Sequence, residues 1–342
     1  MADQTSVLES ARTWLAEGQR VAWATVVGTW SSSPRPVGSQ MVIAPGARFA
    51  GSVSGGCVEG AVIAAADEVF AGGPARTLSY GVTTEQAWEV GLPCGGSIEV
   101  FLAEASRAVV ERLCEAAARR QSIATVSDLG SGVSEVWERG RPSRVVVGEA
   151  LAQAVEAVVH RERSELVEHD GRRVFVHVQG APLRLVVVGA VHLTQALAHL
   201  AKLGGLELCV VDPRTAFATE ERFPGVTLIH EWPDAALQKL ALDARTAVVV
   251  LSHDAKLDEP ALSVALGSEC FYIGALGSRR TQQARRARLA EAGFGERDID
   301  RIHGPVGLAI GALTPPEIAI SIMAQIIQAW RQRPTRDARG AV

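Results

Sequence analysis

Residues 183–212 read LRLVVVGAVHLTQALAHLAKLGGLELCVVD, and this stretch decides the fold of the second half of the chain. The almost wholly apolar run at 183–188 is typical of a strand buried in a parallel sheet. Gly189 ends that run, an amphipathic helical pattern follows, and a second apolar run closes at Asp212. A strand, a glycine turn, a helix and a second strand form the repeating unit of a doubly wound α/β domain.

The same alternation continues toward the C-terminus, with further apolar runs at 247–251 and 270–273. Upstream of residue 182 the strand and helix patterns are weaker and mixed. We therefore expect an α/β protein with an N-terminal mixed α/β domain over 1–181 and a Rossmann-like doubly wound parallel-sheet domain over 182–332. The charged segment 333–342 is expected to form a mobile tail.

Composition indicates a globular protein of about two domains. The chain has 342 residues, 47% of them apolar and 21% charged, which excludes wholesale disorder, collagen and solenoid architectures. The formal net charge of −4 argues against a nucleic-acid binder. The N-terminus lacks a signal-peptide pattern and no apolar stretch reaches roughly 18 residues, so we expect no membrane span and a cytoplasmic location. Five widely spaced cysteines without a C-x-x-C pair predict neither a disulfide framework nor a zinc site.

The turn after the first strand of the second domain departs from a dinucleotide-binding fingerprint, which reads G-x-G-x-x-G. Of the three glycines only Gly189 is present, because Val191 and Thr194 stand at the other two positions. Asp212, 23 positions after Gly189, does lie where an acidic residue would bind a ribose hydroxyl. Two interpretations stay open: a nucleotide-type scaffold that holds no dinucleotide, and an oxidoreductase that binds NAD(P) or FAD.

Polar side chains are expected at the carboxyl edge of this parallel sheet, where ligands of such folds bind. His192 begins the first helix and His253 follows a later strand, so we expect both near Asp212 in a polar pocket. The turn after the strand at 270–273 adds three candidates for holding a phosphate: Ser278, Arg279 and Arg280. The alternative interpretation of this turn is an ordinary helix start with solvated arginines.

In the N-terminal domain, one cysteine follows a pair of glycines. Cys57 comes after Gly55 and Gly56 and is expected in the first turn of a helix, where the helix dipole and free N–H groups favour a thiolate. The N–H groups of such a turn are also expected to meet an anionic ligand. Glu59, two residues further on, is an additional catalytic candidate.

A second glycine turn holds Cys94, which is followed by Gly95 and Gly96. Loop cysteines beside paired glycines have little packing reason to be there, so we expect a functional role for Cys94 as for Cys57. Arg35, in a Ser-Ser-Pro-Arg-Pro turn, adds a cation for an anionic ligand. The other cysteines lie in apolar segments and are expected to be small core residues: Cys114, Cys209 and Cys270.

Together these motifs resemble the XdhC/CoxI family, whose members are accessory proteins of molybdenum hydroxylases such as xanthine dehydrogenase. The matching stretches run in order along nearly the whole chain. They are SSSPRPVGSQMVI (31–43), GSVSGGCVEGAVI (51–63), AWEVGLPCGGSIEVF (87–101), DPRTAFATEERF (212–223), YIGALGSRR (272–280) and GPVGLAIGALTPPEIAISIMAQII (304–327).

The resemblance implies a maturation factor rather than a catalyst. Such a chaperone binds the molybdenum cofactor, protects and sulfurates it, and inserts it into an apo molybdenum hydroxylase of the xanthine, aldehyde or CO dehydrogenase type. The resemblance also implies a cysteine desulfurase as sulfur donor and a homodimer. Cys57 and Cys94 would lie near the molybdenum or its sulfido ligand.

Two positions depart from the family pattern. The Rossmann turn of the family commonly reads G-A-G-H, so Val191 replaces a glycine, and a second family histidine falls on Asp254 or Ala255. Both departures weigh against NAD(P) or FAD as a cofactor. The competing functions are an oxidoreductase, a scaffold that docks a hydroxylase without touching its cofactor, and a copper-handling variant of the family.

Overall fold

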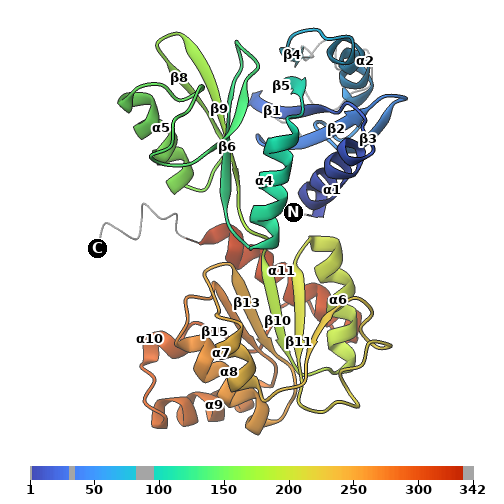
Figure 1. The fold of residues 1–342 in the computed structure, drawn as a ribbon. Helices are drawn as coiled ribbons and strands as arrows, with labels where there is room; N and C mark the ends of the chain where they lie inside the picture. The colour runs from blue at the N-terminus through green and yellow to red at the C-terminus, as the bar shows by residue number, and fades with distance from the viewer. Residues whose placement is uncertain (1, 31–34, 82–95, 334–342) are drawn as a thin grey trace. The chain divides into compact units, whose positions relative to one another are not determined.

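A computed structural model describes residues 2–30, 35–81 and 96–333, shown from blue to red along the chain in Figure 1. Contacts between residues divide the chain between Ala181 and Pro182 into two compact units. The tail expected at 333–342 lies outside the described residues, apart from Arg333. No helix in the described ranges is long and apolar enough to cross a bilayer.

The N-terminal unit contains a five-stranded antiparallel sheet with the strand order β3-β2-β1-β5-β4. Alternate side chains of the central strand β1 point to opposite faces of this sheet. Ala24 and Val26 pack on α2 through Val62 and Ala66, so α2 covers one face. The strands are β1 (Ala22–Trp30), β2 (Gln40–Ala44), β3 (Arg48–Gly51), β4 (Arg76–Gly81) and β5 (Ser97–Glu104), and the helices α1 (Ala2–Ala16), α2 (Glu59–Phe70) and α4 (Arg107–Ala118).

A second antiparallel sheet in this unit has four strands in the order β7-β6-β9-β8. Leu151 and Val155 of α5 pack against Val174 of β9, and Phe175 packs with Phe101 of β5. The predicted mixed α/β character of this half is therefore confirmed. The elements are β6 (Ile123–Asp128), β7 (Ser134–Trp137), α5 (Glu149–His160), β8 (Glu165–His169) and β9 (Arg172–Gln179).

The C-terminal unit contains the parallel sheet that 183–212 predicts, so the Rossmann-like fold is confirmed. Six strands follow the order β12-β11-β10-β13-β14-β15, with every neighbouring pair parallel. All residues of β10 are buried, because helices cover both faces of the sheet. The strands are β10 (Arg184–Val188), β11 (Glu207–Val211), β12 (Thr227–Ile229), β13 (Thr246–Val250), β14 (Tyr272–Ala275) and β15 (Ile302–His303).

The helices of this unit divide between the two faces of the sheet. Leu185 and Val187 of β10 pack in a core with α6 and α11, whereas Val186 and Val188 pack in a core with α7, α8 and α9. Four of the helices, α6, α7, α8 and α9, begin shortly after a strand, which places their N-termini at the carboxyl edge of the sheet (Figure 1). The helices are α6 (His192–Gly204), α7 (Pro233–Lys239), α8 (Ala255–Leu266), α9 (Arg279–Glu291), α10 (Glu296–Ile299) and α11 (Pro315–Gln332).

Candidate functional site

The glycine loop before α2 is organised around the carboxylate of Glu59, the first residue of that helix. Glu59 is buried, and its Oε2 accepts from the Gly56 N–H at 2.8 Å and from the Ser54 hydroxyl. Its Oε1 accepts four more hydrogen bonds: from the Ser52 hydroxyl at 2.7 Å and from the N–H groups of Ser54 at 2.8 Å, Val53 at 3.1 Å and Gly55 at 3.1 Å.

These hydrogen bonds set the ionisation of Glu59. Burial alone would raise the pKa of the carboxyl, but hydrogen bonds from Ser54 and Ser52 and from loop amides outweigh burial and lower the pKa to about 2. Glu59 is therefore an anion at neutral pH. The N–H groups of Gly55 and Gly56, which were expected to meet an external anion, donate to the Glu59 carboxylate in this structure.

Cys57 lies at the exposed end of the same loop. The expectation that it begins the helix is wrong: α2 starts at Glu59 with Val58 as N-cap, so Cys57 precedes the helix. The Cys57 and Val58 N–H groups each donate to the Ser54 hydroxyl at 3.0 Å. Gly56 has φ +121°, a backbone conformation that a side chain would strain. The loop thus holds its shape through its own residues and leaves the Cys57 side chain accessible.

The second glycine turn is only partly within the described residues. Cys94 and Gly95 lie outside them, and Gly96 immediately precedes β5. Arg35 is the first described residue after the gap at 31–34 and is half-buried. The proximity of Cys94 to Cys57 accordingly stays a prediction.

The remaining three cysteines, which were expected to be small core residues, differ in how deeply they are buried. Cys209 and Cys270 are buried, as expected, and burial raises the pKa of both thiols, for Cys209 to about 11. Cys114 is half-buried on α4. None of these three is a stronger nucleophile candidate than the exposed Cys57.

In the C-terminal unit, Asp212 directly follows the last residue of β11, and its side chain is bound by groups of its own chain. The side chain is fully buried, and its Oδ2 accepts from the Ala190 N–H at 2.8 Å. Arg214 forms a bidentate pair with it, through Nε to Oδ1 at 2.8 Å and Nη2 to Oδ2 at 2.7 Å. Burial raises the pKa of Asp212, and the hydrogen bonds from Arg214 and Ala190 outweigh burial and lower it. The carboxylate that would bind a ribose hydroxyl is thus already fully engaged.

The turn after β10 is also held by hydrogen bonds from Arg222 and Thr194. Arg222 donates from Nη1 to the Ala190 carbonyl at 2.8 Å. The backbone N–H and carbonyl of Ala190 therefore both form hydrogen bonds within the chain. Thr194, at the position of the third fingerprint glycine, is fully buried and donates its hydroxyl to the Gly189 carbonyl at 2.6 Å. This geometry gives no support to NAD(P) or FAD binding.

The other predicted residues at this edge are exposed. His192 lies 3.3 Å from Gln195 through Nδ1 and Oε1, and His253 has φ +60°. Among the described residues, no hydrogen bond or ion pair joins either histidine to Asp212, and a polar pocket formed by the three stays a prediction. Ser278 caps α9 by accepting from the Thr281 N–H at 3.2 Å.

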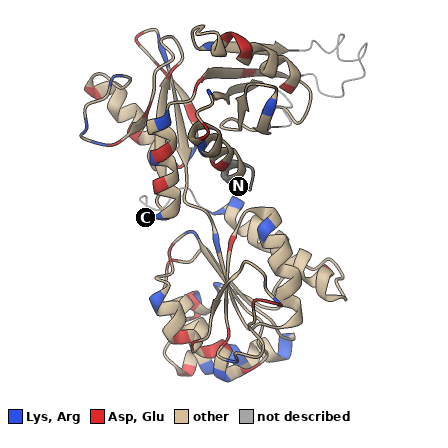
Figure 2. Ribbon diagram, turned by 45° about the vertical axis from the view of Figure 1, so that its right-hand side comes forward, with Lys and Arg blue, Asp and Glu red and all other residues tan. Residues whose placement is uncertain are grey.

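Arg279 and Arg280 are the first two residues of α9, and both are exposed. In Figure 2, Lys and Arg positions (blue) lie along the ribbon at the end of the C-terminal unit where α9 lies, with Asp and Glu positions (red) among them. The arrangement is that of a capped helix start with solvated arginines. A phosphate at this place stays a prediction.

Sequence reasoning missed a buried polar cluster at the same edge. Asp258 of α8 accepts from the Ser252 hydroxyl at 2.6 Å, and its Oδ2 lies 3.4 Å from Nη2 of Arg285 on α9. Arg285 also donates to Gln282 Oε1 at 2.6 Å and to the Leu276 carbonyl at 3.2 Å. The cluster joins the loops after β13 and β14. Arg285 stands among five arginines in RRTQQARRARLAE, a composition typical of a solvated helix, so the sequence carried no signal for its burial.

Gly189 cannot accept a side chain without strain. Its φ is +107°, and an added Cβ would lie 2.8 Å from the Ser252 nitrogen. We expect Gly189→Ala to lower the free energy of unfolding by about 2 kcal/mol or more. Gly225→Ala is the matched control, because Gly225 has φ +70° but open space around it. Urea denaturation of both variants measures the difference, and equal losses at the two positions would contradict the clash.

Comparison with known proteins follows the same division of the chain. The family model described as the XdhC and CoxI family matches residues 14–81, and the model described as the XdhC Rossmann domain matches residues 185–326. The chain belongs to the XdhC/CoxI family. In this member of the family, the first match contains the Glu59-centred loop and the second contains the closed Asp212 turn.

Three curated relatives of this family member stand out. The molybdenum cofactor insertion chaperone PaoD of Escherichia coli K12 is 27% identical over 329 residues, covering 95% of this chain and 88% of PaoD. A probable xanthine dehydrogenase subunit of Bacillus subtilis 168 is 27% identical over 92% of this chain and 94% of its own length. The uncharacterized protein YqeB of Escherichia coli K12 is 40% identical over 163 residues, and that match spans only 30% of YqeB.

A solved structure resembles the XdhC/CoxI chain over almost its whole length. The crystal structure of a xanthine dehydrogenase from Bacillus halodurans superposes with a TM-score of 0.77 and 27% sequence identity, covering 96% of this chain and 97% of that one. The order of the two units is therefore shared with a relative of nearly the same extent.

Proposed function

We propose that this XdhC/CoxI protein is a maturation factor that binds the molybdenum cofactor and inserts it into a molybdenum hydroxylase. Similarity to PaoD, a molybdenum cofactor insertion chaperone, over 95% of the chain supports this function. In the same proposal the cofactor is sulfurated while bound, with a cysteine desulfurase as sulfur donor. The protein acts as a homodimer in the cytoplasm.

The observation that carries the proposal at the level of residues is the exposed Cys57 on a pre-formed loop. A thiolate is a soft ligand suited to molybdenum or to its sulfido ligand. The Glu59 carboxylate holds the loop through hydrogen bonds from Ser52, Ser54 and the intervening amides, so the thiol is presented without any ligand to order it. Cys94 is the second proposed contact to the cargo.

In this proposal the phosphate of the cofactor does not bind to the backbone N–H groups of the loop before α2. The N–H groups of Val53, Ser54, Gly55 and Gly56 already donate to Glu59. Guanidinium groups are the better partners for a phosphate here, and Arg35, Arg279 and Arg280 are the proposed candidates.

The test is cofactor retention by full-length variants purified without oxygen. We expect Cys57→Ser to retain at least about tenfold less molybdenum cofactor per chain, because a hydroxyl is a poor soft ligand. Cys114→Ser, which changes a half-buried cysteine on α4, should retain the wild-type amount. The released pterin measures retention, and reconstitution of an apo-hydroxylase measures insertion.

Two results would redirect the proposal. Wild-type retention by both Cys57→Ser and Cys94→Ser would overturn the assignment of the cysteines. A wild-type chain that docks an apo-hydroxylase but carries no cofactor would overturn binding itself and favour a scaffold.

A further inference from the structure

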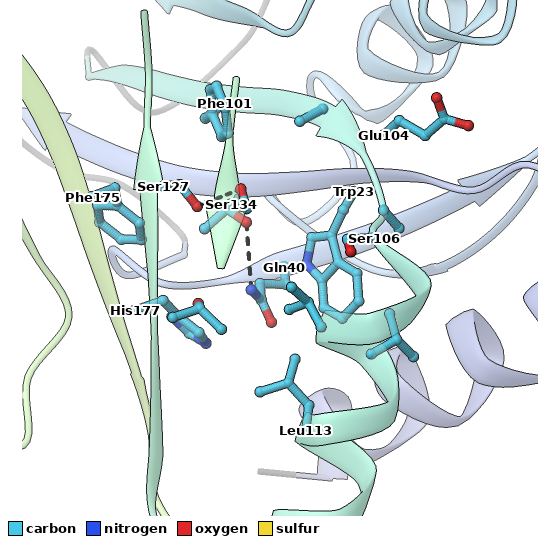
Figure 3. Close-up of a pocket in the computed structure, with 16 residues that line it drawn as sticks. Trp23, Gln40, Phe101, Glu104, Ser106, Leu113, Ser127, Ser134, Phe175 and His177 are labelled. Carbon is cyan, nitrogen blue, oxygen red and sulfur yellow. Dashed lines mark hydrogen bonds between the residues drawn. The ribbon is translucent and has the colours of Figure 1, made fainter. Parts of the chain in front are cut away.

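The N-terminal unit contains a cavity of about 60 Å³ that plays no part in the Cys57 loop. It lies between the face of the five-stranded sheet opposite α2, helix α4 and the four-stranded sheet (Figure 3). Aromatic rings of Trp23, Phe101 and Phe175 form much of its wall. Glu104 and Ser106, which are exposed, also line it, so the cavity opens near the connection between β5 and α4.

Two buried nitrogens on this cavity have no hydrogen-bond partner among the described residues. They are Nε1 of Trp23 and Nε2 of His177. His177 is only 4% exposed, and in Figure 3 it approaches the cavity from the side opposite Trp23, with Gln40 between them. A buried unsatisfied polar group is costly, by about 1–3 kcal/mol each. Two such groups lining one cavity indicate an occupant that forms hydrogen bonds with them.

Trp23 Nε1 is a donor, and His177 Nε2 donates or accepts according to the tautomer of the ring. The indole N–H can only donate. Ser164 Oγ accepts from the Val178 N–H at 3.1 Å and lies 3.1 Å from His177 Nδ1. When the Ser164 hydroxyl donates to Nδ1, His177 Nε2 carries the ring proton and donates; when Nδ1 donates to Ser164, Nε2 accepts. Burial lowers the pKa of His177 to about 4, so the ring is neutral at neutral pH.

The wall offers no unpaired charge to an occupant. Its one carboxylate, Glu104, is engaged with Arg20 at 2.7 Å. The remaining polar groups are neutral, among them the Gln40 amide, which donates to the Thr25 hydroxyl at 3.4 Å. The occupant is therefore uncharged, carries acceptor oxygens and packs against aromatic rings.

We propose that this cavity binds the uncharged lactam edge of a nitrogen heterocycle, whose carbonyl oxygen accepts from Trp23 and whose other amide group pairs with His177 on the opposite side. An apolar cavity of about 150 Å³ holds a whole benzene ring, so a cavity of about 60 Å³ admits an amide-sized edge while the rest of the ring stays at the mouth. Pterins and oxopurines share this lactam. Assigning it to the pterin of the cofactor rests on the proposed function, whereas binding of the lactam does not.

Gln40 links this cavity to the cysteine loop. Its side chain lines the cavity, while its backbone carbonyl accepts from the N–H of Ser52, the first residue of the loop, at 3.1 Å. A heterocycle that contacts the Gln40 amide therefore touches the residue to which the loop is anchored.

The experiment titrates the full chain with two probes, pterin and hypoxanthine, by calorimetry. We expect at least one of them to bind the wild type, and Trp23→Phe to bind it about fivefold more weakly, because one neutral hydrogen bond is lost. Trp137→Phe is the matched control, since Trp137 lies in the same unit but does not line the cavity. Binding should also move the ¹⁵N resonance of His177 Nε2.

The outcomes separate the sources and the two proposals. If only pterin binds, the ligand is the pterin of the cofactor. If only hypoxanthine binds, the ligand is a purine. No binding of either heterocycle at millimolar concentration by the folded wild type, as for a cavity that holds only water, overturns the inference. Equal affinity of wild type and Trp23→Phe overturns it as well. Cofactor retention by Cys57→Ser is measured separately, so either proposal can fail alone.

Discussion

Replacing Glu59 with alanine is expected to lower the free energy of unfolding by about 3–5 kcal/mol. The change removes the acceptor of six hydrogen bonds, two from hydroxyls and four from backbone N–H groups. Each unsatisfied buried donor costs about 1–3 kcal/mol. The total is smaller than their sum because water can reach the exposed Gly55 and Gly56. Urea denaturation followed by circular dichroism measures the loss.

A matched control lies on the same helix. Glu68 is exposed and pairs with Arg76 at the surface, so Glu68→Ala should change stability by less than about 1 kcal/mol. Similar losses for the two variants would contradict the central role of Glu59 in the loop.

Acid titration of the wild type and of Glu59→Gln isolates the contribution of this carboxyl group. Its pKa falls from 4.5 to about 2 in the folded protein, so its contribution is fully present above pH 4.5 and disappears as the pH falls toward 2. The shift corresponds to about 3 kcal/mol. Glu59→Gln should show a correspondingly weaker loss of stability than the wild type across this window. Parallel pH profiles for the two proteins would be inconsistent with the depressed pKa.

Replacing Arg285 with methionine is expected to lower the free energy of unfolding by about 3–5 kcal/mol. The side chains of Arg285 and Asp258 are 6% and 2% exposed, so the variant leaves a buried carboxylate without its cation. Burial raises the pKa of Asp258 and lowers the pKa of Arg285, so desolvation dominates both groups. Thermal and urea denaturation measure the loss. Arg288→Met, which removes an exposed arginine from the same helix, is the control.

The double variant Arg285→Met with Asp258→Asn distinguishes a charge effect from lost packing. Neutralising Asp258 removes the isolated charge, so the double variant should be more stable than Arg285→Met alone. If the losses in the free energy of unfolding of the two single variants add up in the double variant, lost hydrogen bonds and packing, and not the uncompensated carboxylate, cause the destabilisation.

The C-terminal fold could be predicted because buried parallel strands leave an unmistakable pattern. The run at 183–188 is apolar at every position except Arg184, and the structure buries both of its faces. Antiparallel strands such as β8, whose residues are mostly half-exposed, carry a weaker alternation. The N-terminal half could therefore be predicted only as mixed α/β, without its division into two antiparallel sheets.

The sequence predicted where the candidate site lies but not the hydrogen bonds between its residues. The glycine loop and Cys57 stood out, yet hydrogen bonds to Glu59 depend on the path of the backbone, which composition does not reveal. Asp212 was placed correctly at the end of its strand. Its engagement by Arg214, two residues away, depends on side-chain rotamers that no spacing rule predicts.

If the proposed cargo docks at Cys57, the loop that Glu59 orders before α2 also bears on how fast that cargo leaves. Because folding has already ordered residues 52–58 around Glu59, docking at Cys57 loses little conformational entropy, and departure does not require the loop to melt. The residence time is then governed by the bond to the thiol and by the cargo's more distant contacts. In the proposed function, the chain would then release the cofactor to its acceptor without first unfolding this loop.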